Sequence, residues 1–182
     1  MDKLFKYSKI VSCIALLTTI ICATTFNSNN TIIYTYRFAS IIALYLSISI
    51  WYGFIAIKSV AGSNLKTLSV LGCVFTFTIV IAEILLRNNV FTTLLMSTFL
   101  YISSIGGIGL GFVFTRLSIF FNKRLIKTLA IVLGVLLLLN NLGFTLILSF
   151  DITLKINLVF LINIIIWGLY SAFFFFFSKY NK

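Results

Sequence analysis

The sequence contains no histidine and no proline, and only three of its 182 residues are acidic. Without an imidazole there is no histidine-ligated haem or zinc and no histidine base. The three acids, Asp2, Glu83 and Asp151, are too few and too far apart for a mechanism with paired carboxylates. We therefore expect a protein that is not an enzyme and that holds no metal or cofactor.

Cysteine is scarce as well. Cys13, Cys22 and Cys73 show no C-x-x-C spacing, and a nucleophilic cysteine would lack its usual histidine base. A cysteine without reactive neighbours behaves as a small apolar residue. We expect all three to be buried.

Charge is scarce too, because 9% of the residues are charged and 61% are hydrophobic, with a mean hydropathy of +1.16. Soluble domains carry roughly 25% charged residues, so this composition predicts an integral membrane protein. Apolar runs of about 20 residues are long enough to cross a bilayer as helices. Six such runs predict one all-α transmembrane bundle over residues 1–182, with spans at 10–26, 38–57, 67–86, 90–115, 128–150 and 157–178.

The distribution of basic residues predicts how these spans are oriented. With six spans, eleven of the fourteen lysines and arginines lie on one side of the membrane, and only Arg37, Arg87 and Lys155 lie on the other. Basic residues are retained on the cytoplasmic side during insertion. We expect both termini in the cytoplasm and the charge of +11 to encode orientation rather than nucleic-acid binding.

The first run permits two interpretations. Its basic start and the Ile21-Cys22-Ala23 sequence resemble a weak signal-peptide cleavage site, and cleavage there would leave five spans. Ala15, Thr19 and Ala23 also form a line of small residues at four-residue spacing, which lets another helix approach closely. That helix is either a neighbouring span or a partner subunit.

Glycine is concentrated in SSIGGIGLGFVF, residues 103–114. Its spacing fits neither a dinucleotide fingerprint nor a phosphate loop. Ser103, Gly107 and Gly111 instead fall at four-residue intervals along one helical face, which favours close helix packing, and Gly106 and Gly109 are expected to broaden the same groove. The alternative is a locally unwound helix whose backbone lines a site, as in some transporters.

Several polar residues lie within the apolar runs, where such groups are costly without partners. Glu83 is near the outer end of the third span, and Arg87 is in reach as an ion-pair partner on the same helix. The asparagines could join helices or line a cavity open to the outside, with aromatic walls. The candidate ligand-binding residues are Glu83, Tyr101, Asn140, Asn141, Asn163 and Trp167.

The longest basic segment is RLSIFFNKRLIK, residues 116–127. As a helix, it would align Leu117, Phe121 and Leu125 on one apolar face. Such a segment suits anionic lipid headgroups or a cytoplasmic partner, and the residues in contact would be Arg116, Lys123, Arg124 and Lys127. The run of five phenylalanines at 173–177 is interpreted as bulk facing lipid.

Six spans in about 180 residues, with both ends inside, resemble the substrate-binding S components of energy-coupling-factor vitamin transporters. In that family, small residues of the first helix contact a membrane coupling subunit, and substrate binds near the outer face. The resemblance places Ala15, Thr19 and Ala23 at such a contact. The chain departs from the family in having no proline and only weakly developed outer loops.

Two functions follow from these patterns. The first is binding or transport of a small solute, alone or as the membrane component of a multi-subunit transporter. The second is a non-catalytic structural, accessory or immunity subunit of a membrane complex. The expected partners are membrane lipids, other membrane subunits or a cytoplasmic ATPase, and no nucleic acid. Abundant Ile, Phe, Asn and Lys suit an AT-rich genome, so we expect a bacterial cytoplasmic membrane, although some organelles fit as well.

Overall fold

The computed structural model describes residues 2–24, 41–45, 48, 51, 63–87, 93–150 and 156–180. These residues are almost entirely helical, and no strand occurs among them. A short 3-10 turn, η2 (Ser118–Phe120), joins two of the long helices. The five long helices are α1 (Asp2–Thr24), α3 (Ser63–Arg87), α4 (Thr93–Leu117), α5 (Arg124–Phe150) and α6 (Ile156–Tyr180).

Three segments are long and apolar enough to cross a membrane, judged by length and composition over the described residues. They are Thr98–Phe120, Arg124–Ile147 and Leu161–Lys179, and Ser8–Ile21 and Thr67–Ala82 are shorter apolar helical stretches. A helix satisfies its own backbone hydrogen bonds, which lipid cannot do. The predicted all-helical class is therefore confirmed for these residues, and three of their segments are compatible with a membrane protein. Most of the expected second span, 38–57, lies outside the described residues.

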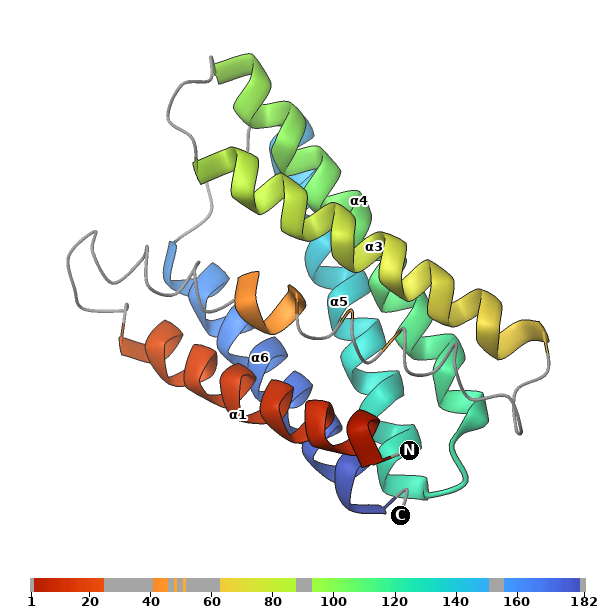
Figure 1. Ribbon diagram of the computed structural model, residues 1–182. Coiled ribbons are helices and arrows are strands. Elements are labelled where there is room, and N and C mark those ends of the chain that lie inside the picture. Colours follow the sequence, from red (N-terminus) through yellow and green to blue (C-terminus); the bar gives the residue numbers. More distant parts are fainter. Residues whose placement is uncertain are drawn as a thin grey trace.

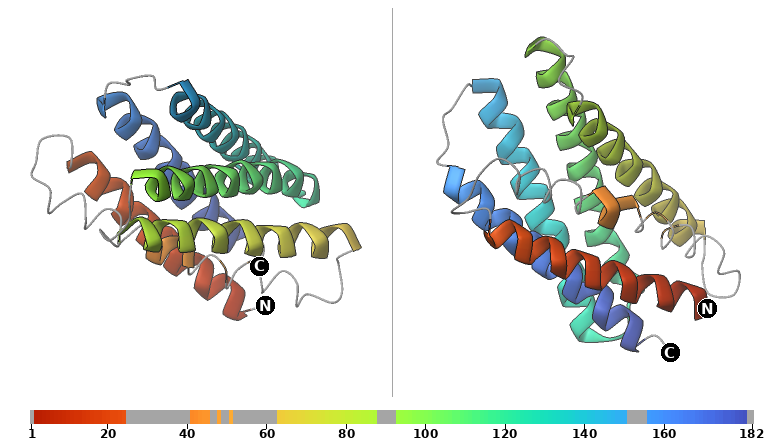
Figure 2. Two further views of the ribbon diagram at one scale, coloured as in Figure 1. Left: turned by 90° about the horizontal axis from the view of Figure 1, so that it is seen from above. Right: turned by 60° about the vertical axis from the view of Figure 1, so that its left-hand side comes forward.

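The helices pack in an order that differs from their order in the chain. α1 packs on α6, α6 on α5, α5 on α4, and α4 on α3. Figures 1 and 2 show that the first turn of α1, the last turn of α6 and the connection from α4 to α5 lie at one end of the molecule. We call this the basal end. The distal end carries the start of α4, the end of α5 and the start of α6.

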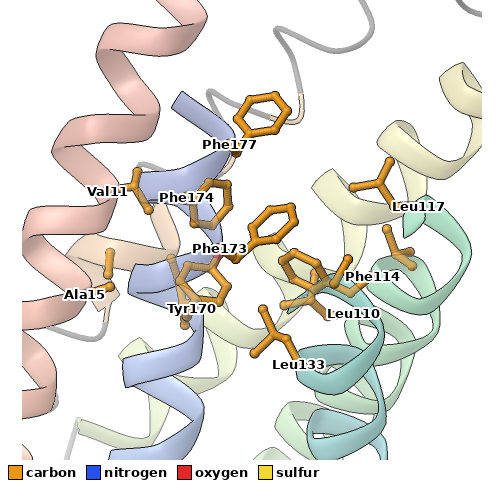
Figure 3. Packing of buried hydrophobic residues seen from close by; sticks show 14 of the residues in the cluster. Val11, Ala15, Leu110, Phe114, Leu117, Leu133, Tyr170, Phe173, Phe174 and Phe177 are labelled. Atoms are coloured by element: carbon orange, nitrogen blue, oxygen red, sulfur yellow. The ribbon is translucent and has the colours of Figure 1, made fainter. Parts of the chain in front are cut away.

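The core of the molecule is a set of aromatic side chains centred on Phe114 of α4. Its ring contacts those of Trp51, Tyr170, Phe173 and Phe174 edge-on, at centroid distances of 5.4, 5.8, 5.2 and 6.4 Å. Edge-to-face pairs are favourable because the positive edge of one ring meets the negative face of the other. Figure 3 shows the rings of Phe114, Tyr170, Phe173 and Phe174 between α4, α5 and α6, with Val11 and Ala15 of α1 on the other side of α6. We call these four rings and that of Trp51 the aromatic cluster.

The phenylalanine run was expected to face lipid, and this is wrong for three of its five residues. Phe173, Phe174 and Phe177 are buried, whereas Phe175 is half exposed and Phe176 is partly buried. Five consecutive residues of a helix point all around its axis, so one run supplies both core and surface. The core rings of α6 come from the residues that face α4 and α5.

α1 and α6 are joined by a reciprocal pair of serines. The Ser12 hydroxyl donates to the backbone carbonyl of Ser171, and the Ser171 hydroxyl donates to that of Ser12, each at 2.8 Å. Both residues are buried. Because each hydroxyl reaches the backbone of the other helix, this contact requires a close approach that larger side chains would prevent.

α4 lies between α3 and α5, and its glycines allow the approach on both sides. A Cβ atom at Gly111 would lie 2.7 Å from the carbonyl oxygen of Gly134, and one at Gly134 would lie 2.7 Å from that of Gly111. The backbones of α4 and α5 therefore meet directly. α4 is helical without interruption through this stretch, which contradicts the unwound alternative.

Gly106 and Gly109 do not broaden the groove that faces α5. A Cβ at Gly106 would lie 2.7 Å from Ile79 Cγ1, and one at Gly109 would overlap the ring of Phe75. Both neighbours belong to α3. Each residue turns a helix by about 100°, so Gly106 points away from the direction of Gly107 and serves a second interface.

The contact between Gly111 and Gly134 predicts that alanine lowers the stability of the protein at Gly111 but not at Gly143. Gly111→Ala should lower the free energy of unfolding by about 1–3 kcal/mol, because the new methyl group meets a backbone carbonyl that cannot rotate away. Gly143→Ala is the matched control on α5, since no atom lies within 4 Å of its Cβ position. Thermal unfolding in mild detergent measures both variants. Equal stability of the two would contradict this account of the interface.

Candidate functional site

The inward faces of α5 and α6 change from apolar to polar with distance from the basal end. On α5, Leu133 is buried in the core, and Asn140 occupies the same face seven residues further on. On α6, Tyr170 is buried in the aromatic cluster, and Asn163 occupies the same face seven residues earlier. The two helices run in opposite directions, so both steps lead toward the distal end.

α4 shows the same change. Leu110 is buried, and half-buried Ser103 precedes it by seven residues on the same face. Seven residues of helix span about 10 Å. Ser103, Asn140 and Asn163 therefore lie on inward faces at a similar depth above the aromatic cluster. Ser103, predicted as a packing residue, joins the two asparagines in this position.

The burial of side chains in α4, α5 and α6 also changes between the basal and the distal end. The described residues of α5 after Gly134 include none that is fully buried, and this also holds for residues 98–103 of α4 and 161–165 of α6. The fully buried residues of these three helices lie toward the basal end instead. The bundle is thus closed by aromatic packing basally and is less tightly packed distally.

The amides of Asn140 and Asn163 differ from that of Asn141. Within the described part of the chain, neither Asn140 nor Asn163 has a side-chain hydrogen bond, although each is half-buried. The Asn141 Nδ2 group donates to the Leu137 carbonyl at 2.8 Å, and its side chain fills the space that a Cβ at Gly107 would need. Asn141 therefore packs against α4, whereas Asn140 faces inward.

The remaining candidate ligand residues differ in their surroundings. Trp167 is buried beside Tyr170, with ring centroids 5.5 Å apart. Tyr101 is half-buried on the side of α4 that carries exposed Ile105 and Phe112, away from the core. Glu83 belongs to α3, but its side chain lies outside the described part of the structure. Tyr101 is therefore apart from Asn140 and Asn163, whereas Trp167 lies one helical turn from Asn163 on α6.

The small residues of α1 spread over different environments. Ala15 is fully buried on the α6 side, Thr19 is half-buried near Gly168, and Ala23 is exposed. The Thr19 hydroxyl donates to the Ala15 carbonyl at 2.8 Å. Much of this line is thus occupied by α6 of the same chain. Cys13, which was expected to be buried, is exposed because it lies one residue beyond Ser12, off the α6-facing side.

The basic segment is not one amphipathic helix, and that prediction is wrong. α4 ends at Leu117, and α5 begins only at Arg124. The Ser118 hydroxyl donates to the Thr115 carbonyl at 2.6 Å, and its own carbonyl accepts from the Phe121 amide at 3.2 Å, which closes the η2 turn. Leu117 and Phe121 enter the core, while the candidate headgroup residues Arg116, Lys123, Arg124 and Lys127 are all exposed.

Sequence reasoning missed two features. The pairing of Ser12 with Ser171 joins residues 159 positions apart, which no local pattern reveals. The central role of Phe114 also depends on which faces of three helices converge. The spacing of Ser8, Ser12 and Ala15 on one face of α1, together with the predicted line of small residues that begins at Ala15, was the local signal for the α1–α6 interface.

No three potential metal-ligating side chains of His, Cys, Asp or Glu lie together among the described residues. No protein-family model matches the sequence, and no curated protein or solved structure is significantly similar to it. The resemblance to the S components therefore rests on the expected six-span layout alone.

A double-mutant cycle tests whether Asn141 and Gly107 act through packing. Gly107→Ala alone should cost about 1–3 kcal/mol of stability, because its methyl group overlaps the Asn141 amide. In an Asn141→Ala background the same change should cost less, with a coupling of about 0.5 kcal/mol or more. Chemical unfolding in mixed micelles gives the four free energies. Strictly additive costs would show that the two residues do not contact each other.

Proposed function

We propose that this protein binds and moves a small polar solute across a membrane, alone or as the membrane component of a multi-subunit transporter. The observation that carries the proposal is the pair of half-buried asparagines, Asn140 and Asn163, on the inward faces of α5 and α6. Binding sites in membrane helices combine mostly apolar walls with a few placed polar groups. The aromatic cluster beneath them supplies a floor that would stop the solute from passing freely.

The same residues indicate the chemistry of the solute. An amide both donates and accepts hydrogen bonds. No charged residue occurs in 93–115, 128–150 or 156–178, which include the inward faces of α4, α5 and α6. A site of this composition favours an uncharged polar solute over an ion, since a buried ion would lack a countercharge.

In this proposal the chain crosses the membrane six times with both termini in the cytoplasm. The basal end then faces the cytoplasm, and the asparagines lie on the outer side of the aromatic cluster. Two facts support this orientation: the basic residues of 116–127 occur at the basal end, and α1 begins and α6 ends there. A bacterial cytoplasmic membrane fits this layout.

The alternative is an accessory, structural or immunity subunit without a ligand. That function needs helix faces free to dock a partner. The small-residue faces suited to docking are largely filled within the chain, since Ala15 packs on α6, and Gly107 and Gly111 pack on α5. A partner subunit or cytoplasmic ATPase would have to dock on other surfaces, so the geometry favours the solute-binding function.

Substituting adjacent asparagines separates binding from packing. We expect Asn140→Leu and Asn163→Leu each to weaken solute binding about tenfold, because a hydrogen bond that the site provides is lost. Asn141→Leu is the matched control: the change is the same, one residue away, but its amide faces α4 and bonds to Leu137. Native mass spectrometry of the protein purified in mild detergent reports the retained small molecule.

The purification also decides between the two functions. A reproducible small molecule that is lost in Asn140→Leu and kept in Asn141→Leu supports the proposal, and a stoichiometric ATPase in addition identifies a transporter component. A protein that carries a membrane subunit but no small molecule, and whose three asparagine variants behave alike, supports the accessory function instead.

A further inference from the structure

Four cations are exposed where α4 passes into α5. Arg116 lies in the last turn of α4, and Lys123, Arg124 and Lys127 lie around the start of α5. Lys123 and Lys127 are one helical turn apart, with the Lys127 amide donating to the Lys123 carbonyl at 3.0 Å. We call these four residues with η2 the basal turn.

Nothing along this part of the chain neutralises these charges. No acidic residue occurs between Glu83 and Asp151, and the first turn of α5 contains none. The amino end of a helix carries partial positive charge, so cations there are unfavourable. An external anion would relieve this repulsion.

Orientation during insertion explains the presence of basic residues but not the apolar side chains beside them. Ile119 is 66% exposed, and Phe120 and Leu125 are also exposed. The η2 turn holds this arrangement, because Ser118 and Phe121 are buried on its inner side. Ile119 and Phe120 therefore point outward from a fixed turn.

Arg116 connects the charged and apolar parts. Its guanidinium lies over the ring of Phe112 at 5.4 Å from the centroid, and Phe112 is exposed on the outer surface of α4. A cation over an aromatic ring can lie at an apolar boundary while its donors stay available. The charge is thus held where a membrane surface would meet the bundle.

We propose that the basal turn binds the headgroup of an anionic phospholipid. The phosphate contacts Lys123, Arg124 and Lys127, while Ile119 and Phe120 enter the acyl region of the same leaflet. Adjacent exposed cations and apolar groups match a lipid, which offers both a phosphate and a hydrocarbon chain. A soluble anion would leave Ile119 and Phe120 without a role. This inference does not depend on the proposed transport function.

The test is competition between lipids in native mass spectrometry. The intact protein in mild detergent is titrated with phosphatidylglycerol and phosphatidylcholine of identical acyl chains. We expect phosphatidylglycerol to bind preferentially. Each basic residue near a membrane surface strengthens binding to anionic lipid about fivefold, so a variant with Lys123→Gln, Arg124→Gln and Lys127→Gln should lose affinity on the order of 100-fold.

Three controls make the result specific. Lys179→Gln removes one exposed cation from the last turn of α6, outside the basal turn, and should weaken phosphatidylglycerol binding no more than about fivefold. Lys123→Arg with Lys127→Arg keeps the charge and should bind as the parent does. Ile119→Ser with Phe120→Ser keeps every charge and should weaken phosphatidylglycerol binding about tenfold, through the loss of buried apolar area.

The outcomes divide clearly. Loss of preference in the glutamine variant and weaker binding in the serine variant support the site. Preference retained in the glutamine variant overturns it, as does displacement of the lipid by soluble glycerophosphoglycerol, which would indicate a site for free anions. If the glutamine variant fails to insert, the serine variant decides, and unchanged phosphatidylglycerol affinity there contradicts the proposal.

Discussion

The close approach of α4 to both of its neighbours is the contact on which the other packing depends. Lipid is as apolar as a leucine side chain, so helices in a membrane gain little from burying apolar surface and associate through close packing instead. Gly111 and Gly134 let the backbones of α4 and α5 touch, and Gly106 and Gly109 let α3 approach from another direction. This places Phe114 of α4 where its ring contacts Phe173 of α6 and Trp51. Without the glycines, the aromatic cluster would lose its central ring.

The aromatic cluster in turn divides the bundle into two parts of different character. Toward the basal end, large rings fill the space between α4, α5 and α6, and the fully buried residues of these helices lie there. Toward the distal end, the same inward faces present Ser103, Asn140 and Asn163, which are only half-buried. A closed basal half and a polar distal half support the proposal that the protein binds a solute on one side of the aromatic cluster. The exposed basal turn fits a surface that meets lipid headgroups on the other.

The sequence was sufficient for the class of protein and for the approximate extents of the long helices, because length and hydropathy are local properties. It was also sufficient to single out the glycine stretch. It could not distinguish Asn140 from its neighbour Asn141, since both lie at the same depth and only the direction of each side chain separates them. The phenylalanine run was misread for a related reason: a repeated residue conceals which positions face inward. The serine pair between α1 and α6 depends on tertiary register, which a single sequence does not contain.

The most direct test of the division into two halves is the reaction of single cysteines with a membrane-impermeant maleimide, in a background without the native cysteines. Asn140→Cys and Asn163→Cys should react when the reagent is added from the outside, because the proposed function requires these positions to face a hydrated region. Leu133→Cys is buried in the core, and Leu142→Cys is on the exposed apolar side of α5, so both should stay unreactive. If Asn140→Cys and Asn163→Cys react no faster than Leu142→Cys, the distal half holds no water and the account is wrong.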